Sequence, residues 1–206
     1  MRNKSFLGRG LVGFVAVVLL GLVTNAGAAQ RNKGQLEPPT ARDTRRMEAL
    51  KEEVRHQLAL LPYYSVFDWL QAEVKADGTV ILTGKAVRPT LKDDAEARVK
   101  KLENVTRVIN DIGVLPLSPM DDELRITLYR RIYNFDSPLF RYATSSVPPI
   151  HIIVKNGHVT LKGIVANQSD SNLAYMAARQ VPGVFDVKNE LQVEERVGER
   201  VSRLHT

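Results

Sequence analysis

The chain has 206 residues, no cysteine and a formal net charge of +6. Without cysteine it cannot build a disulfide scaffold, a thiolate zinc site, a cysteine nucleophile or a lipidated N-terminal cysteine. Apolar residues make up 44% of the sequence, which is enough to build a core and argues against a disordered chain.

The first 29 residues have the pattern of a secretory signal peptide. Basic residues at the start are followed by an uncharged apolar run over residues 11–23, and then by small residues around Ala28. The pattern favours a cleaved signal over an uncleaved membrane anchor, because the run is short and Thr24, Asn25 and several glycines weaken a membrane span. We expect residues 1–29 to direct export, to the periplasm in a bacterium, and residues 30–44 to form a linker.

The excess positive charge lies outside the part of the chain that we expect to fold. Lys and Arg balance Asp and Glu over residues 43–117, and they balance again over residues 118–194. A nucleic-acid binder needs a basic domain face, which releases counterions when it contacts phosphates. We therefore expect no nucleic-acid partner.

The rest of the chain contains one unit written twice. Residues 77–84 match residues 156–163, and residues 105–110 match residues 184–189, in both cases 79 positions apart. An unbroken offset of this kind indicates an internal duplication. The apolar stripe upstream matches at an offset of 74, so the second copy carries about five extra residues before its first strand. The duplication predicts domains at 45–116 and 117–195, with a tail at 196–206.

Each copy reads as helix, strand, strand, helix, strand. Apolar residues at helical spacing over residues 47–61 predict a helix that ends at Pro62. Alternating residues on both sides of Asp77-Gly78 predict a hairpin. A second helix is expected over residues 91–102 and a last strand over residues 108–114. The expected fold class is α+β, with two tandem α-β-β-α-β domains, each a three-stranded mixed sheet covered by two helices.

The alternation leaves two registers open for the first hairpin. A two-residue loop would set Lys75 opposite Val80 on the core face, whereas a longer loop with Gly78 in a bulge sets Val74 opposite Val80. We predict the second register, because it keeps the lysine off the core face. Applied to the second copy, the same register sets Ile153 opposite Val159.

The element order and its motifs resemble the BON domain, named for bacterial OsmY and nodulation proteins. Residues 157–163 read G-H-V-T-L-K-G and residues 182–193 read P-G-V-F-D-V-K-N-E-L-Q-V, which fit the family pattern closely. The first copy departs at Glu103-Asn104-Val105, where the family usually has Gly before Val. The resemblance covers about residues 45–194. With two such domains behind a signal peptide, the chain is similar to the osmotically inducible periplasmic proteins. It implies a protein without enzymatic activity that attaches to phospholipid membranes, supports envelope integrity or acts as a periplasmic chaperone.

Aromatic residues gather where the first helix of each copy connects to its first strand. Phe67 and Trp69 in the first copy, and Phe140 and Tyr142 in the second, are candidates for a membrane or client contact, because aromatic side chains favour such interfaces. The alternative, which we favour, is that they fill space between helix and sheet or between the two copies, since exposed aromatic clusters are uncommon.

Arginines cluster near the same connection in the second copy. Arg130, Arg131 and Arg141 lie close to its aromatic residues and could meet anionic headgroups, at about 1 kcal/mol per charge near the surface. The alternative is a solvated helix face paired with the acidic residues at 121–123, which we favour because surface ion pairs are common and weak.

We expect no catalytic, cofactor-binding or metal site. His151 and His158 lie on opposite arms of one hairpin, and with His158 opposite Val154 they are too far apart to share an ion. The glycines of the hairpins do not form a phosphate loop between a strand and a helix. Ser169 and Asp170 begin a helix, where such residues act as caps.

The sequence predicts an exported protein, and the resemblance implies a non-enzymatic protein that is peripheral to a membrane. The expected partner is a phospholipid surface or an envelope protein, with no cofactor and no small-molecule substrate. Two alternatives stay open: a periplasmic chaperone that binds unfolded clients, and a structural subunit of an envelope assembly.

Overall fold

The computed structural model describes residues 40–194, which fold as two copies of the predicted unit. The expected signal peptide, most of the linker and the whole of the tail lie outside the described residues. No helix in the described part of the chain is long and apolar enough to cross a membrane.

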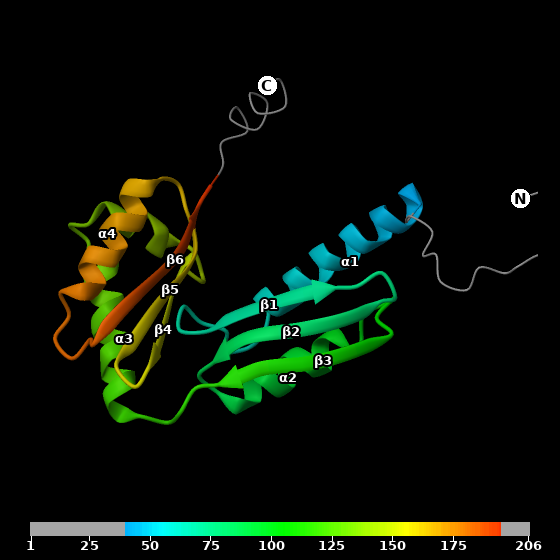
Figure 1. The fold of residues 1–206 in the computed structure, drawn as a ribbon, viewed down its shortest axis with the longest axis horizontal. Coiled ribbons are helices and arrows are strands. Elements are labelled where there is room, and N and C mark those ends of the chain that lie inside the picture. The colour runs from blue at the N-terminus through cyan, green and yellow to red at the C-terminus, as the bar shows by residue number, and fades with distance from the viewer. Residues whose placement is uncertain (1–39, 195–206) are drawn as a thin grey trace, which may run out of the picture. The chain divides into compact units, whose positions relative to one another are not determined.

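The first repeat is a three-stranded sheet with helices on one face (Figure 1). Its helices are α1 (Ala41–Ala59) and α2 (Pro89–Val99), and its strands are β1 (Trp69–Val74), β2 (Thr79–Ala86) and β3 (Arg107–Val114). The strand order is β1-β2-β3; β1 and β2 are antiparallel, and β2 and β3 are parallel. The second helix forms the crossover that a parallel pair requires.

The second repeat has the same topology. It contains α3 (Pro119–Ile132), a 3-10 segment η1 (Pro138–Thr144), β4 (Ile150–Lys155), β5 (His158–Val165), α4 (Gln168–Arg179) and β6 (Asp186–Val193). The strand order β4-β5-β6 again joins an antiparallel pair to a parallel pair. The extra residues counted in the sequence fall in the connection that contains η1. The predicted fold class, two tandem α+β domains with mixed sheets, is confirmed.

The first helix begins earlier than its apolar stripe indicates. The Thr40 side chain accepts a hydrogen bond from the Asp43 amide, and the Asp43 carboxylate accepts one from the Thr40 amide, so the two residues form a capping box. Helix α1 therefore starts at Ala41, inside the segment that we predicted as linker.

The two hairpins differ in register. Val74 lies opposite Val80, as predicted. In the second repeat the prediction is wrong, because Val154 and not Ile153 lies opposite Val159, and His158 lies opposite Lys155.

The turns explain the difference between the hairpins. Asn156 and Gly157 both have positive φ, at 52° and 76°, which is the geometry of a two-residue turn of type I′. The first hairpin has one residue more in its loop, with Lys75 N donating to Thr79 O. Because residues 152–154 are all apolar, alternation did not distinguish the two registers of the second hairpin.

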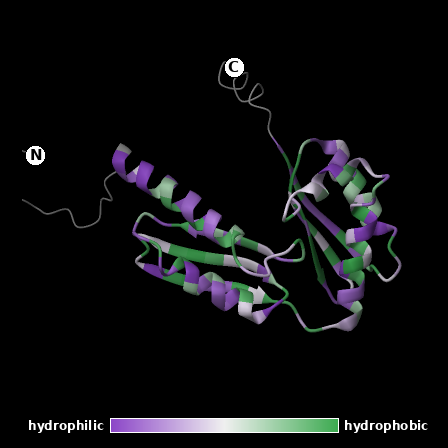
Figure 2. Cartoon of the chain, turned by 180° about the vertical axis from the view of Figure 1, so that it is seen from behind, coloured by the Kyte–Doolittle hydropathy of each residue, from purple (hydrophilic) through white to green (hydrophobic). Residues whose placement is uncertain are grey.

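Each repeat buries its own apolar cluster between sheet and helices. Figure 2 shows hydrophobic strands beneath helices whose outer faces are hydrophilic. In the first cluster the helices contribute the buried Val54 and Leu91, and strand β2 contributes Leu82. In the second cluster Leu128 and Leu161 occupy the positions that correspond to Val54 and Leu82.

An asparagine fastens the last strand of each repeat to its second helix. Asn110 donates to the Lys92 carbonyl at 2.9 Å and accepts from the Ile112 amide, and Asn189 makes the same kind of bonds with Ser171 and Leu191. A side-chain amide that bonds the helix on one side and its own strand on the other positions the helix over the sheet. Asn110 is half-buried and Asn189 is exposed.

The connection between α1 and β1 belongs to both repeats. Val66 is buried in the apolar cluster of the second repeat, and its carbonyl accepts a hydrogen bond of 2.8 Å from the Ile152 amide on β4. The Asp68 carboxylate holds the connection in shape, because it accepts bonds from the Ser65 and Val87 amides.

Candidate functional site

Exposed aromatic residues gather beyond the end of α3. Phe135 is 78% exposed and Phe140 is 39% exposed, and their rings meet edge to face with centroids 5.1 Å apart. An exposed pair of this kind offers apolar area that the core does not use. Phe135 was not among the predicted contact residues, although it lies in the same aromatic-rich connection.

The two arginines of the last turn of α3 lie next to this pair in the chain. Arg130 and Arg131 are both exposed, and Arg131 donates to the Gln180 side chain at 2.5 Å. Their positive charge complements the partial negative charge at the C-terminal end of the helix. We call Arg130, Arg131, Phe135, Phe140 and Arg141 the α3–η1 surface.

Asp170 holds η1 in place against the start of α4. Its buried carboxylate pairs with Arg141 and accepts a hydrogen bond of 2.6 Å from the Tyr142 hydroxyl. The Tyr142 hydroxyl in turn accepts from the Ala166 amide at 2.8 Å. Arg141 also donates to the Tyr142 hydroxyl at 3.4 Å. This bond first, and then the pairing with Asp170, raise the pKa of Arg141 above its ordinary value. Tyr142 is therefore a positioning residue for η1, and only part of the Arg141 charge is free for a ligand.

The other two predicted aromatic contact residues, Phe67 and Trp69, are half-buried where the chain passes from α1 to β1. The Phe67 ring lies 6.3 Å from Tyr129, and the Trp69 ring lies 5.0 Å from His151, centroid to centroid. These neighbours come from α3 and β4, so both side chains pack between the repeats. This is the alternative that the sequence analysis favours for them.

The histidine of this junction, His151, is buried, and burial favours its neutral form. His151 Nδ1 lies 2.5 Å from the Asp68 carbonyl oxygen, which can only accept, so Nδ1 carries the proton. Burial lowers the pKa of His151, and the Asp68 contacts oppose this effect only in part. In the register of the β4–β5 hairpin, His151 lies opposite Lys162, and His158 lies opposite Lys155. Within residues 40–194 no group of three metal-ligating side chains occurs.

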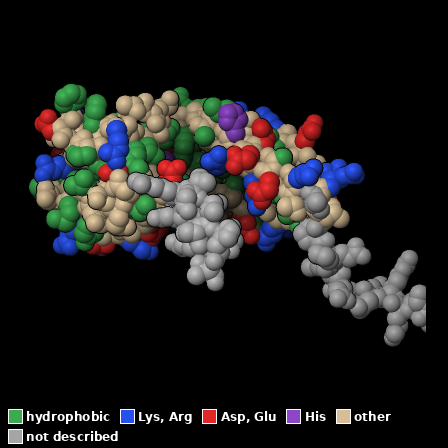
Figure 3. Space-filling model, turned by 90° about the horizontal axis from the view of Figure 1, so that it is seen from above, with side chains coloured by type: hydrophobic (Ala, Val, Ile, Leu, Met, Phe, Trp, Pro, Cys, Tyr) green, Lys and Arg blue, Asp and Glu red, His purple; other side chains and the backbone are tan. Residues whose placement is uncertain are grey.

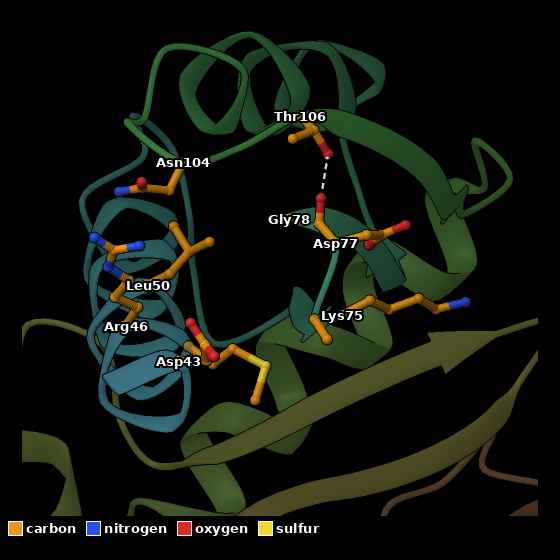
Figure 4. A pocket seen from close by; sticks show the side chains of 10 residues that line it. Asp43, Arg46, Leu50, Lys75, Asp77, Gly78, Asn104 and Thr106 are labelled. Atoms are coloured by element: carbon orange, nitrogen blue, oxygen red, sulfur yellow. Dashed lines mark hydrogen bonds between the residues drawn. The ribbon is translucent and has the colours of Figure 1, made fainter. Parts of the chain in front are cut away.

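A pocket of about 280 Å³ lies at the start of α1 in the first repeat (Figure 4). Leu50 points into it from the helix, and Lys75 of the hairpin reaches away from it. Both carboxylates at its rim have lowered pKa values, because Asp43 is bonded to Thr40 and Asp77 to Thr79. With these carboxylates used in a cap and a turn, the pocket offers no pair of groups for acid–base chemistry.

The second repeat fills the corresponding place with a carboxylate. Asp121, buried on α3, accepts hydrogen bonds from the Asn156 and Gly157 amides at 2.7 and 2.9 Å. At the offset of 74, Met47 stands in its position in the first repeat. The pocket therefore reflects a side-chain replacement between the two copies.

One face of the described part of the chain carries charges of both signs. Figure 3 shows Lys and Arg mixed with Asp and Glu on the face in view, with hydrophobic side chains gathered over the second repeat. This agrees with the balanced charge of both repeats in the sequence.

Comparison with known proteins gives a family match. Residues 48–116 and 141–195 match the family model described as the BON domain. The second matched region begins after α3, so Arg141 and Tyr142 lie inside it, and Arg130 and Arg131 do not. No curated protein matches the chain.

Two solved structures of one protein from Chlamydia trachomatis are also similar. The structure described as the C-terminal domain of CdsD, the structural protein of the type III secretion system, is 14% identical with a TM-score of 0.26, and the match covers 70% of this chain and 96% of that chain. A second structure of CdsD is 15% identical with a TM-score of 0.27, covering 77% and 98%. At these TM-scores the similarity does not support a conclusion about function.

Proposed function

The chain belongs to the BON domain family, and from this premise we propose that it is a non-enzymatic protein of the cell envelope that associates with phospholipid membranes and supports envelope integrity under stress. The family consists of non-catalytic binding domains, linked in general terms to phospholipids and to the envelope. Export to the periplasm by residues 1–29 is part of the same proposal.

The α3–η1 surface is the proposed membrane contact. Phe135 and Phe140 present apolar rings where a membrane–water interface favours aromatic side chains. Arg130 and Arg131, close to these rings in the chain, supply positive charge worth about 1 kcal/mol each near an anionic surface. The exposed Asp136 in the same stretch subtracts from that attraction. The exposed aromatic pair carries the proposal, because it is apolar area without a partner among the described residues.

Vesicle co-sedimentation tests the proposal. The sample contains residues 30–206, so that the apolar run at 11–23 does not contribute to vesicle binding. We expect binding to anionic vesicles that falls with salt, because exposed charges are screened within about 10 Å at 0.1 M salt, and weak binding to neutral vesicles. Binding that is independent of salt, or no binding, contradicts it.

Two variants with matched controls locate the contact. Arg130→Gln with Arg131→Gln should weaken binding to anionic vesicles, whereas Lys100→Gln with Lys101→Gln changes net charge equally and should not. Phe135→Ser should weaken binding more than Phe185→Ser, because both rings are exposed to a similar extent, at 78% and 75%, and only Phe135 belongs to the α3–η1 surface. If chains that do not bind vesicles still prevent a model client from aggregating, the chaperone function replaces the membrane function.

A further inference from the structure

A pocket lies on the face of the second sheet that α3 and α4 leave uncovered (Figure 1). Val159 and Leu161 of β5 belong to the apolar cluster under the helices, and side chains alternate between the two faces of a strand. Thr160 and Lys162 therefore point to the opposite face, where they line the pocket. Its volume is about 450 Å³. Small-molecule sites commonly measure about 300–1,000 Å³, so the pocket has room for a small ligand.

One residue from each strand of the sheet contributes to a row of side chains in this pocket. Ile153 of β4 lies opposite Thr160 of β5, and Thr160 lies opposite Lys188 of β6. Ile153 is buried and Thr160 is half-buried, whereas Lys188 is exposed. An apolar side chain, a hydroxyl and an ammonium group therefore stand side by side across the sheet.

Four lysines line the pocket, from both repeats. They are Lys85, Lys155, Lys162 and Lys188. The last three come from β4, β5 and β6, and Lys85 comes from β2 of the first repeat. The Lys85 side chain lies across Gly113 of β3, where an added Cβ would be 2.6 Å from its Nζ. Cations from two sheets thus meet at one hollow, which raises the local concentration of anions.

The neighbouring carboxylates do not cancel this charge. Glu190, the acidic residue among those that line the pocket, pairs with both Lys162 and Lys188, the latter at 2.6 Å. These two lysines, Lys162 foremost, lower the pKa of Glu190, so its carboxylate is charged at neutral pH. Asp186, next to the pocket, pairs with His158. Four ammonium groups therefore face one carboxylate among the lining residues.

Lys162 is held in place before any ligand arrives. Its side chain is only 27% exposed, it pairs with Glu190, and its ammonium lies 5.9 Å from the centroid of the Trp69 ring. A side chain that is already ordered loses less conformational freedom when it binds a ligand. Lys162 is therefore better prepared for binding than a freely moving surface lysine.

The first repeat lacks this cluster at the matching positions. At the offset of 79, Thr83 stands in place of Lys162, and Ile109 stands in place of Lys188. The cluster therefore belongs to the second repeat alone. The balanced total charge of residues 118–194 conceals it, since three of the acidic residues lie at 121–123 on α3.

We propose that this pocket binds a small ligand that carries at least two negative charges on phosphate groups. Lysine ammonium groups bind phosphate as point charges, whereas the planar fork that grips a carboxylate at two points belongs to arginine. The residues that line the pocket, all of them within residues 40–194, include four lysines and no arginine. The Thr160 hydroxyl donates to a phosphate oxygen between the ammonium groups.

The phosphate groups belong either to a soluble compound or to the headgroup of a lipid. Both present the same chemistry to the lysines, and the experiments below distinguish them. The pocket is a site other than the α3–η1 surface, and its binding of phosphate does not depend on that surface.

The single tryptophan of the chain reports on this pocket, because the Trp69 ring lies close to the Lys162 ammonium. Inorganic pyrophosphate is the probe. Titration of the full chain with pyrophosphate at constant ionic strength should change the Trp69 emission in a saturable way, and sodium chloride of equal ionic strength should not. Isothermal titration calorimetry measures the binding independently. No saturable change in emission, together with no heat of binding, overturns the proposal.

Two double variants separate the pocket from a general attraction of anions. Lys155→Gln with Lys188→Gln should weaken pyrophosphate binding about tenfold, because two of the ammonium groups around the ligand are lost. Lys100→Gln with Lys101→Gln is the matched control, since it changes net charge equally and both lysines are exposed at the end of α2, outside the pocket. Equal weakening by both double variants would mean that net charge alone attracts the probe, which contradicts the proposal.

Thr160→Val tests the hydroxyl without a change of charge. Valine is also β-branched and suits a strand, so the sheet should be kept. Binding of pyrophosphate should weaken about tenfold, because a hydrogen bond to a charged group is stronger than one between neutral groups. Undiminished binding by Thr160→Val and by the Lys155 and Lys188 variant would place the probe elsewhere and overturn the proposal.

Vesicles of phosphatidylcholine and phosphatidic acid distinguish the two sources of phosphate. If the ligand is a headgroup, Lys155→Gln with Lys188→Gln should lower co-sedimentation with these vesicles as well as pyrophosphate binding. If the ligand is soluble, the variant should lose pyrophosphate binding and keep its vesicle binding. Both results support the pocket, whereas loss of vesicle binding by a chain that never bound pyrophosphate contradicts it. The α3–η1 surface is tested at Arg130 and Arg131, so the two proposals fail separately.

Discussion

At the scale of the single residue, His151 makes stability depend on pH. Burial lowers its pKa below the ordinary value of about 6.5, so below that pH the unfolded chain binds more protons than the folded chain. Its contribution to stability is therefore complete above about pH 6.5 and is lost as the pH falls from there. The charge of the Asp68 carboxylate opposes this effect, because it raises the pKa of His151.

We expect the free energy of unfolding to fall between pH 7.5 and pH 5.5, and to fall less in His151→Gln. His56→Gln is the control, because His56 is exposed on α1 and should leave the pH dependence unchanged. Urea unfolding at three pH values measures the three slopes. If His151→Gln has the same slope as the unchanged chain, the ring does not titrate at the junction as described.

At the scale of the element, Gly163 is the residue on which the β4–β5 hairpin depends most. It has φ of +123°, and a Cβ there would overlap the Pro149 carbonyl oxygen across the hairpin. Gly163→Ala should lower the free energy of unfolding by about 3 kcal/mol, because both the backbone and the neighbour oppose it. Gly113→Ala should cost less than about 1 kcal/mol, since its Cβ would meet only the flexible Lys85 side chain. Equal losses in chemical denaturation would contradict this account.

The local sequence pattern predicted the helices and strands better than it predicted where they begin and end. Alternation and helical spacing identified every strand and α-helix within residues 40–194, and the repeat offset supported them in pairs. The start of α1 was missed because the Thr40–Asp43 capping box precedes the apolar stripe. The register of β4 was missed because three consecutive apolar residues suit either face, and the Asn156-Gly157 turn decides between them.

The candidate site was predictable only in part. The aromatic and arginine content of the connection after α3 is visible in the sequence, and it drew attention to Phe140 and Arg141. Which aromatic ring is exposed depends on tertiary contacts. Tyr142 donates a hydrogen bond to Asp170, whereas Phe135 is exposed. No local pattern distinguishes Phe67, which packs against α3, from Phe135, because the difference arises from a partner far away in the chain.

At the scale of the whole molecule, the buried side chain of Val66 links the two repeats. Val66 belongs to the chain of the first repeat and to the apolar cluster of the second, and its carbonyl covers the edge of β4. Domains of this size bury little surface alone and are marginal in stability. The second repeat should therefore depend on a connection that lies before β1.

Val66→Ala tests this dependence. It removes two buried methyl groups and should cost about 1–3 kcal/mol. The loss should appear as faster hydrogen exchange at the β4 and β5 amides, with Ile152 foremost, because its partner carbonyl becomes less well held. Leu60→Ala is the control, since Leu60 is 56% exposed in the same connection. Were the repeats independent, Val66→Ala would change exchange only in β1 to β3. Slower exchange in the second repeat than in the first, unaltered by the substitution, would mean that the β4 edge is stable without its cover.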